Sequence, residues 1–143
     1  MLTEKTYKKV IKNGKINLSE FNNVITCIIV DFPGNKIPKN TFPYMTENED
    51  GDFDYMTLEM NGHKRLNYKE PNYYKYWQPY MGKLPSSYNH SYAYTFSTDP
   101  TNHKINSGSI DLSRLNSFFV SFIGAKEGTE VDVSFITILT PKL

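Results

Sequence analysis

The sequence predicts an all-β protein built as an antiparallel sandwich or barrel. Short apolar or alternating runs recur along the chain, each bounded by Gly, Pro, Asn or Asp, whereas helical periodicity is weak almost everywhere. Aromatic residues are abundant, with 11 Tyr, 9 Phe and 1 Trp. Rings that bury their bodies and keep a hydroxyl in water suit the partly solvated strands of such a fold. The 143 residues suffice for one domain with a single core.

The first half of the chain contains a predicted edge strand and the clearest buried strand. Lysines are scattered through residues 6–12, and they discourage edge-to-edge pairing, so we expect an edge strand there. Asn13-Gly14 predicts a tight hairpin turn, with residues 15–18 as the returning strand. Residues 24–32 are β-branched and apolar on both faces, which predicts a buried strand that ends at Pro33-Gly34.

A long surface loop is expected from residue 33 to residue 51. This stretch is polar, interrupted by three prolines, and ends in a group of acidic residues. A loop of this length without secondary structure of its own is often functional. The acidic side chains are numerous enough to bind a hard cation, but their spacing does not match an EF-hand loop, so a solvated acidic loop is favoured. The residues concerned are Glu47, Glu49, Asp50, Asp52 and Asp54.

The second half of the chain predicts five strands and one short helix. The strands cover residues 53–60, 92–96, 109–115, 117–123 and 130–140. Asn61-Gly62 supplies turn chemistry after the first of these. The last strand breaks its alternation at Ile136, which predicts burial on both faces or a bulge. Pro71 suits the first turn of a helix, so a short helix is predicted around residues 71–78, ending before Pro79.

Charge and cysteine content narrow the classes of function. With 16 basic and 15 acidic residues, the chain has no field that would drive tight binding to nucleic acid or to an anionic membrane. The single cysteine, Cys27, lies in an apolar run and is expected to be a buried hydrophobe, which suits a reducing compartment. The N-terminus shows no apolar signal core, and no apolar run approaches the ~20 residues that span a bilayer, so we expect a soluble protein.

No residue pattern for enzymatic chemistry is visible. His63, His90 and His103 are far apart, and none has a metal-ligand spacing with Cys, Asp or Glu. His63 and His103 lie beside turns, where solvated loop histidines are expected. The sequence shows no Gly-rich phosphate loop, nucleophile elbow or paired-carboxylate strand. We therefore expect no enzymatic activity, catalytic residue, metal or other cofactor.

Residues 67–80 form the densest aromatic cluster, and three interpretations of it are open. The favoured one is that the cluster caps one end of the sandwich core. It could instead form a subunit interface, since Tyr73, Tyr74 and Trp77 are typical anchors. The third interpretation is a stacking platform for sugar or nucleic-acid rings. Nearby cations such as Arg65 make single-strand binding conceivable, but the overall neutrality of the chain argues against it.

The order of motifs between residues 53 and 123 resembles the C-terminal jelly roll of the major capsid proteins of large nucleocytoplasmic DNA viruses. In that family a strand with an Asn-Gly turn precedes an Arg, a Tyr-containing segment ending near Gln-Pro, an aromatic strand, a Pro, a Pro-Ser-Gly turn and an Asn-x-Ser-Arg strand. The counterparts here are, in chain order, Asn61-Gly62, Arg65, Tyr73-Tyr74, Gln78-Pro79, residues 92–96, Pro100, Asn106-Ser107-Gly108 and residues 111–114. Residues 1–23 are the least similar to the family.

The resemblance implies one jelly-roll domain over residues 1–143, an antiparallel β-sandwich, with a structural role in a viral capsid. The family's capsid proteins are double jelly rolls, so this chain would supply the second roll alone, as a truncated, split or single-jelly-roll relative. Arg114 stands where the family carries an arginine, which implies an ion pair with Asp111 or with a neighbouring carboxylate.

The resemblance also implies partners and a location. Loops at 33–52 and 62–91 would hold neighbouring copies together in a homo-oligomer, a trimer by analogy, with other capsid proteins as further partners. The chain would act in the virion, assembled in the host cytoplasm, without direct contact to nucleic acid and without membrane insertion. Two alternatives stay open: a carbohydrate-binding β-sandwich module that uses the Tyr/Trp cluster at 73–80, and, ranked lowest, a cupin-type enzyme.

Overall fold

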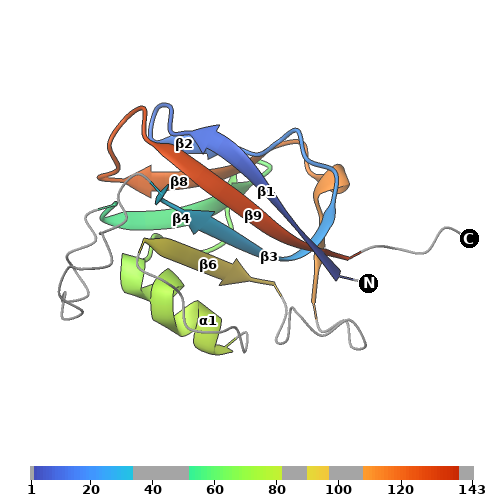
Figure 1. The fold of residues 1–143 in the computed structure, drawn as a ribbon. Helices are drawn as coiled ribbons and strands as arrows, with labels where there is room; N and C mark the ends of the chain where they lie inside the picture. Colours follow the sequence, from blue (N-terminus) through green and yellow to red (C-terminus); the bar gives the residue numbers. More distant parts are fainter. Residues whose placement is uncertain (1, 34–51, 82–89, 97–107, 139–143) are drawn as a thin grey trace, which may run out of the picture.

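Two antiparallel sheets form a sandwich, and a short helical segment lies beside one edge (Figure 1). The computed structural model describes residues 2–33, 52–81, 90–96 and 108–138. The strands are β1 (Leu2–Val10), β2 (Lys15–Asn17), β3 (Val24–Asp31), β4 (Tyr55–Met60), β5 (His63–Lys64), β6 (Ser91–Thr95), β7 (Ile110–Asp111), β8 (Phe118–Ile123) and β9 (Glu130–Ile138). The helical elements are the π-helix η2 (Tyr73–Trp77), the α-helix α1 (Gln78–Met81) and the 3-10 helix η3 (Leu112–Arg114).

The chain passes from one sheet to the other at most of its connections, and this produces a jelly roll. One sheet has the strand order β1-β9-β3-β6, with the short β7 paired to β3, and the other has the order β2-β8-β4-β5. Strands that are neighbours in a sheet are therefore mostly distant in sequence. Strands interleaved between two antiparallel sheets in this way make a jelly roll. The predicted all-β sandwich of jelly-roll type is confirmed.

The edge strand, the tight hairpin turn and the returning strand are where the sequence predicted them, but beyond the turn the returning strand pairs with the other sheet. β1 lies at a sheet edge and pairs with β9 alone. Asn13 and Gly14 both have positive φ, 54° and 72°, as a tight turn requires. Lys12 and Lys15 form two backbone hydrogen bonds with each other across this turn, at 2.9 and 3.0 Å, and the rest of β2 pairs with β8 of the other sheet. Because Ile16 is fully buried, its contact with the second sheet decides the pairing.

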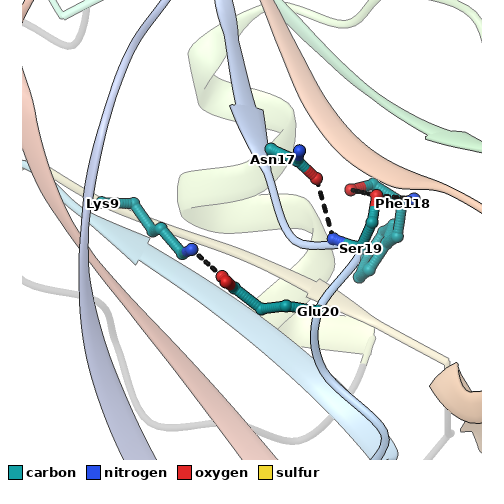
Figure 2. Close-up of polar contacts among 5 residues, drawn as sticks. All are labelled: Lys9, Asn17, Ser19, Glu20 and Phe118. Atoms are coloured by element: carbon teal, nitrogen blue, oxygen red, sulfur yellow. Dashed lines mark hydrogen bonds and ion pairs between the residues drawn. The ribbon is translucent and has the colours of Figure 1, made fainter.

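The connection from β2 to β3 returns the chain to the first sheet and makes polar contacts with strands of both sheets (Figure 2). The backbone N–H of Ser19 donates to Oδ1 of Asn17 at 2.9 Å. Oγ of Ser19 accepts from the backbone N–H of Phe118 in β8 at 3.0 Å. Glu20 forms an ion pair with Lys9 of β1. These contacts hold the β2–β3 connection against β8 of one sheet and β1 of the other.

Aromatic rings fill the space between the sheets near the start of β4 and β6. Phe32 and Tyr92 come from one sheet, and Phe53 and Phe122 come from the segments of the other. The ring centroids of Phe53 and Tyr92 are 4.7 Å apart, and those of Phe53 and Phe122 are 5.2 Å apart. All four side chains are buried. Steeply inclined rings at these distances make favourable edge-to-face contacts, so this cluster joins the two layers.

The central strands β3 and β9 are buried on both faces and also carry a bulge. Ile25 pairs with Thr137, whereas Cys27 pairs with Ile136, so the register shifts at Thr26. Cys27 and Ile136 belong to a small apolar cluster separate from the main core. Of the two features predicted for the last strand, double-sided burial is present in β9, whereas the extra residue of the bulge, Thr26, lies in the neighbouring strand β3. Cys27 is buried, as predicted.

The helical segment differs from its prediction because it continues through Pro79. Helical conformation begins at Pro71 and passes through η2 into α1, which ends at Met81. The backbone N–H of Gln78 donates to the carbonyl of Tyr73, five residues earlier. Proline lacks an N–H and clashes with the preceding turn of an α-helix, but the wider π-helical turn gives it room. The prediction that the helix ends before Pro79 is therefore wrong.

The helical segment covers the open edge of β6 (Figure 1). Tyr74 is fully buried, and its hydroxyl donates to the carbonyl of Met56 in β4 at 2.5 Å. Oε1 of Gln78 accepts from the backbone N–H of Thr95 at 3.1 Å, which satisfies a donor on the outer side of β6. Covering an edge in this way prevents another chain from pairing with it. Within the described ranges, no helix has the length and apolar character that crossing a membrane requires.

The strand predicted over residues 109–115 is present only at Ile110 and Asp111, as β7. After β7 the chain turns into η3. Oδ1 of Asp111 accepts from the backbone N–H of Ser113 at 3.0 Å and from its hydroxyl at 2.6 Å. An Asp that bonds to the backbone two residues later offers the chain an alternative to the strand ladder. This local bond overrides the alternating apolar pattern.

Phe122→Ala should lower the free energy of unfolding by about 3–5 kcal/mol, because it opens a cavity between the sheets. Urea unfolding followed by circular dichroism measures the loss. The control is Ile123→Ala, the next residue of β8, which is 46% exposed and should change stability by no more than about 0.5 kcal/mol. Equal losses in the two variants would contradict the assignment of this ring cluster as the contact that joins the layers.

Tyr74→Phe should alter how stability depends on alkaline pH. Burial, aided by the nearby hydroxyls of Tyr73 and Tyr94, raises the pKa of Tyr74. The unfolded phenol ionises near its usual pKa of about 10, so its contribution to stability is present below that pH and is lost as the pH rises above it. Tyr74→Phe has no phenol hydroxyl to ionise at this position, so it should not lose this contribution to stability as the pH rises. At pH 7 the substitution should lower the free energy of unfolding by only about 1 kcal/mol, because the carbonyl of Met56 still accepts a hydrogen bond from the N–H of Lys69.

Urea unfolding at pH 7 and at about pH 10.5 compares the unmodified chain, Tyr74→Phe and the control Tyr55→Phe. Tyr55 is 41% exposed, so its removal should leave the pH dependence unchanged. If Tyr74→Phe loses as much stability on going to high pH as the unmodified chain does, then the buried phenol is not the source of that loss.

Candidate assembly surface

The five residues that the sequence singled out lie in two separate places. Arg65, Tyr73, Tyr74 and Trp77 belong to the segment between β5 and α1, whereas Arg114 ends η3. Figure 1 shows η3, in orange, well away from the green helical segment. The structure therefore brings four of the residues into one region and leaves Arg114 apart from them.

Tyr74 anchors the helical segment and does not belong to the surface. Its side chain is fully buried and is held by the hydrogen bond to β4 described above. Tyr73, beside it, is half-buried, and the two ring centroids are 5.1 Å apart. The hydroxyl of Tyr73 accepts from Nε2 of Gln78 at 2.9 Å, and the ammonium of Lys69 lies 5.5 Å from the centre of its ring. Tyr73 therefore has a fixed orientation and still reaches the surface.

Arg65 links the edge of one sheet to the edge of the other. Its backbone N–H donates to the carbonyl of Leu58 in β4 at 2.7 Å. Its side chain is directed to the other sheet, where Nε donates to the hydroxyl of Tyr94 at 3.4 Å. The guanidinium also lies 5.6 Å from the ring centre of Phe96, within the range of a cation–π contact. Arg65 as a whole is exposed, so its planar group is also accessible to a partner.

Arg114 makes an ion pair with the partner that the sequence suggested, but the pair is loose. Nε of Arg114 lies 3.6 Å from Oδ2 of Asp111, and the arginine side chain is 86% exposed. Hydrogen bonds from Ser113 are the main cause that lowers the pKa of Asp111, and Arg114 acts in the same direction more weakly. An exposed pair of this kind contributes little to stability. Most of the guanidinium therefore remains available for other contacts.

Two aromatic rings stand out on the surface of the helical segment. Trp77 is 54% exposed and Tyr76 is 48% exposed. Together with Asn72 and Tyr73 they line an open hollow of about 600 Å³. The sequence had singled out Tyr73 and Trp77 individually, whereas Tyr76 and Asn72 were not distinguished from the rest of the aromatic segment. Only the turn of the helix decides which of these side chains share a face.

A buried polar cluster escaped prediction. Oδ2 of Asp52 lies 2.7 Å from Nδ1 of His90, and the hydroxyl of Tyr92 donates to the same oxygen at 2.5 Å. Asp52 precedes β4 and His90 precedes β6, so the cluster joins segments that lead into different sheets. The expectation of a solvated acidic loop is therefore wrong for Asp52. These residues are separated by about 40 positions, and no local pattern connects them.

The described residues show no arrangement for metal chemistry. Across their ranges, no group of three or more His, Cys, Asp or Glu side chains could hold a metal ion. His63 is exposed beside its turn, as expected. Other predicted features lie outside the described residues, namely the loop at 34–51 with Glu47, Glu49 and Asp50, as well as Pro100, His103 and Asn106-Ser107. The chemistry that this surface presents is that of aromatic rings and guanidinium groups.

Solved capsid structures have the same fold as this chain. Similarity to a chain of the PBCV-1 virus capsid has a TM-score of 0.65 at 15% identity and covers 95% of this chain and 46% of that one. Similarity to the Faustovirus major capsid protein has a TM-score of 0.64 at 13% identity and covers 95% of this chain and 32% of that one. Similarity to the major capsid protein of bacteriophage PM2 has a TM-score of 0.59 at 12% identity and covers 98% of this chain and 45% of that one. This chain thus spans less than half the length of these relatives.

At these identities the structural similarity establishes the fold alone. No curated protein sequence matches the chain. The model of one family, described as the large eukaryotic DNA virus major capsid protein, matches residues 30–133. This match runs from the end of β3 into β9 and includes strands of both sheets. The chain therefore belongs to the major capsid protein family of large eukaryotic DNA viruses.

Proposed function

We propose that the chain is a structural subunit of a viral capsid, which assembles with copies of itself through the loops and edges of its jelly roll. The observation that carries this proposal is the family match over residues 30–133, because it includes complete strands of both sheets, namely β6 and β7 of the first and β4, β5 and β8 of the second. Two layers that share one close-packed core form a stiff body. A shell needs stiff subunits, since the angle between neighbouring contacts must be the same in every copy.

The strand edges of the first sheet favour assembly through side chains over assembly through backbone pairing. At one edge, β1 carries the exposed cations Lys5 and Lys8, which resist the approach of another strand. At the other edge, β6 is covered by the helical segment. Contacts between copies would therefore come from turns and from exposed side chains at the ends and edges of the sandwich.

Arg65 and Arg114 are the residues that we propose for these contacts. Both are exposed, and the intramolecular partners that the structure gives them leave the guanidinium accessible. A planar guanidinium can bind a carboxylate of a neighbouring copy through two parallel hydrogen bonds. A formal net charge of +1 means that identical copies repel each other only weakly.

The proposed assembly unit is a homotrimer by analogy with the family, and other capsid proteins would be its further partners. Its place of action would be the virion, assembled in the host cytoplasm. This role depends on contacts between surfaces, so it needs no catalytic residue and no cofactor. It also needs neither direct contact with nucleic acid nor insertion into a membrane.

Self-association should be visible by size-exclusion chromatography with light scattering. The apparent mass should rise with protein concentration from the 16.6 kDa of one chain toward about three times that value. Mass action produces this rise because association is favoured at high concentration. A mass that stays at one chain up to about millimolar concentration would contradict self-assembly by this chain.

Arg114→Ala should weaken the self-association by about tenfold, since truncation of an interface arginine commonly costs more than about 1 kcal/mol. The midpoint of urea unfolding should not change, because the ion pair with Asp111 is exposed. Lys126→Ala, at an exposed turn between β8 and β9, is the matched control and should associate like the unmodified chain. Indistinguishable association of the two variants would exclude Arg114 from the contact.

A further inference from the structure

Two Asn-Gly dipeptides form tight turns in this chain, and the structure surrounds them differently. Asn13-Gly14 lies between β1 and β2, and Asn61-Gly62 joins β4 to β5. All four residues have positive φ, between 53° and 81°. An asparagine followed by glycine can lose its side-chain amide, because glycine has no Cβ to keep its backbone nitrogen away from the side-chain carbonyl carbon. Both turns therefore carry the groups for the same reaction.

The side-chain carbonyl of Asn61 lies against two backbone donors. Its Oδ1 accepts from the backbone N–H of Asn116 at 2.6 Å and from that of Ser117 at 3.4 Å. The backbone N–H of Asn61 donates to the carbonyl of Ser117 at 3.0 Å, so the residue is held against the chain that leads into β8. Two N–H groups on one carbonyl oxygen form an oxyanion hole, because their hydrogen bonds strengthen as negative charge develops on that oxygen.

The two glycines differ in their freedom to move. Gly62 is exposed, and among the described residues other than its chain neighbours no heavy atom lies within 4 Å of the position that a Cβ would occupy. At Gly14 the same position lies 3.2 Å from the carbonyl oxygen of Phe122. The carboxylate of Glu127 also holds this turn, since it accepts from the N–H of Asn13 at 2.6 Å and from the N–H of Gly14 at 3.3 Å. The backbone nitrogen of Gly62 can therefore turn toward its asparagine, whereas that of Gly14 is restrained.

We propose that Asn61 is a site of spontaneous deamidation, and that the fold directs this reaction to Asn61 in preference to Asn13. The backbone nitrogen of Gly62 attacks Cγ of Asn61, and the new bond closes a succinimide ring. The bond from Cγ to Nδ2 breaks, and ammonia leaves with the proton that the glycine nitrogen gives up. Water then opens the ring at either carbonyl, which yields aspartate or isoaspartate. During the attack, negative charge develops on Oδ1, where the two backbone N–H groups lie.

The modification changes the charge and the backbone of an exposed turn. One added carboxylate gives 16 acidic residues against 16 basic ones, so the formal net charge falls from +1 to 0. Isoaspartate also lengthens the backbone of the β4–β5 turn by a methylene group, close to Arg65. The fraction of chains that carry this change should therefore increase with the age of the folded protein.

Incubation of the intact chain at neutral pH, followed by peptide mapping with mass spectrometry, measures the loss of each amide over time. In the folded chain Asn61 should be lost at least about tenfold faster than Asn13. In concentrated urea the two rates should converge, because both dipeptides have then lost their tertiary contacts. Methylation by an isoaspartyl methyltransferase identifies the isoaspartate product. Equal rates in the folded chain overturn the proposal, and so does a ratio of rates that is the same with and without urea.

Asn116→Pro removes the N–H that donates to Oδ1 of Asn61 and should slow the loss of this amide by about tenfold. Proline suits the position because Leu115 before it is extended, with φ −93° and ψ 134°. Asn116→Ala keeps the N–H, so it is the matched control and should react like the unmodified chain. Circular dichroism confirms that both variants are folded. A rate in Asn116→Pro that equals or exceeds the rate in Asn116→Ala overturns the proposal.

Glu127→Ala tests the restraint on the other turn without altering the surroundings of Asn61. Glu127 is exposed, so the variant should fold like the unmodified chain. Its removal frees the N–H of Gly14 and should speed the loss of Asn13 by about fivefold, while the rate at Asn61 stays the same. An unchanged or slower loss of Asn13 would overturn the claim that the fold protects this asparagine.

Discussion

The contact between the inner faces of the two sheets holds the rest of the structure in place. Consecutive strands mostly enter different sheets, so neither sheet can form from one continuous piece of chain. β8 and β9 come last in sequence, yet each lies between two earlier strands. Their positions therefore depend on burial of side chains between the sheets, such as Phe122 against Phe32 and Phe53 against Tyr92. Strand pairing alone could not select this order, because backbone hydrogen bonds are similar in any register.

The buried polar cluster of Asp52, His90 and Tyr92 makes the contact between the two sheets specific. Tyr92 packs its ring among the aromatic residues and directs its hydroxyl to Asp52, which also meets His90. His90 has a φ of 66°, in the left-handed region that is unfavourable for most residues, and its carbonyl accepts from the N–H of Phe32 at 2.9 Å. A strained backbone persists where several contacts fix it together. In a low-dielectric interior such a network permits one arrangement, because any other leaves a buried carboxylate without its donors.

The outside of the sandwich divides into surfaces with different chemistry. The edges of the first sheet are protected, one by the lysines of β1 and the other by the helical segment. The guanidinium groups of Arg65 and Arg114 are placed where neighbouring molecules can reach them, and the rings of Tyr76 and Trp77 form a separate apolar area. The rigid jelly roll thus positions these groups so that much of each remains accessible, which is how one fold can serve different functions.

The sequence by itself determined the local elements, because these depend on neighbouring residues. Alternation and turn chemistry located β4, β8 and the Asn61-Gly62 turn, and motif order identified the family. Tertiary structure decided where these elements go. It moved β2 to the second sheet, carried the helix through Pro79, and buried Asp52 against His90. It also gathered Asn72 with three rings. Each of these outcomes results from contacts between segments that are distant in sequence or from the exact phase of a helix, and no local pattern encodes either.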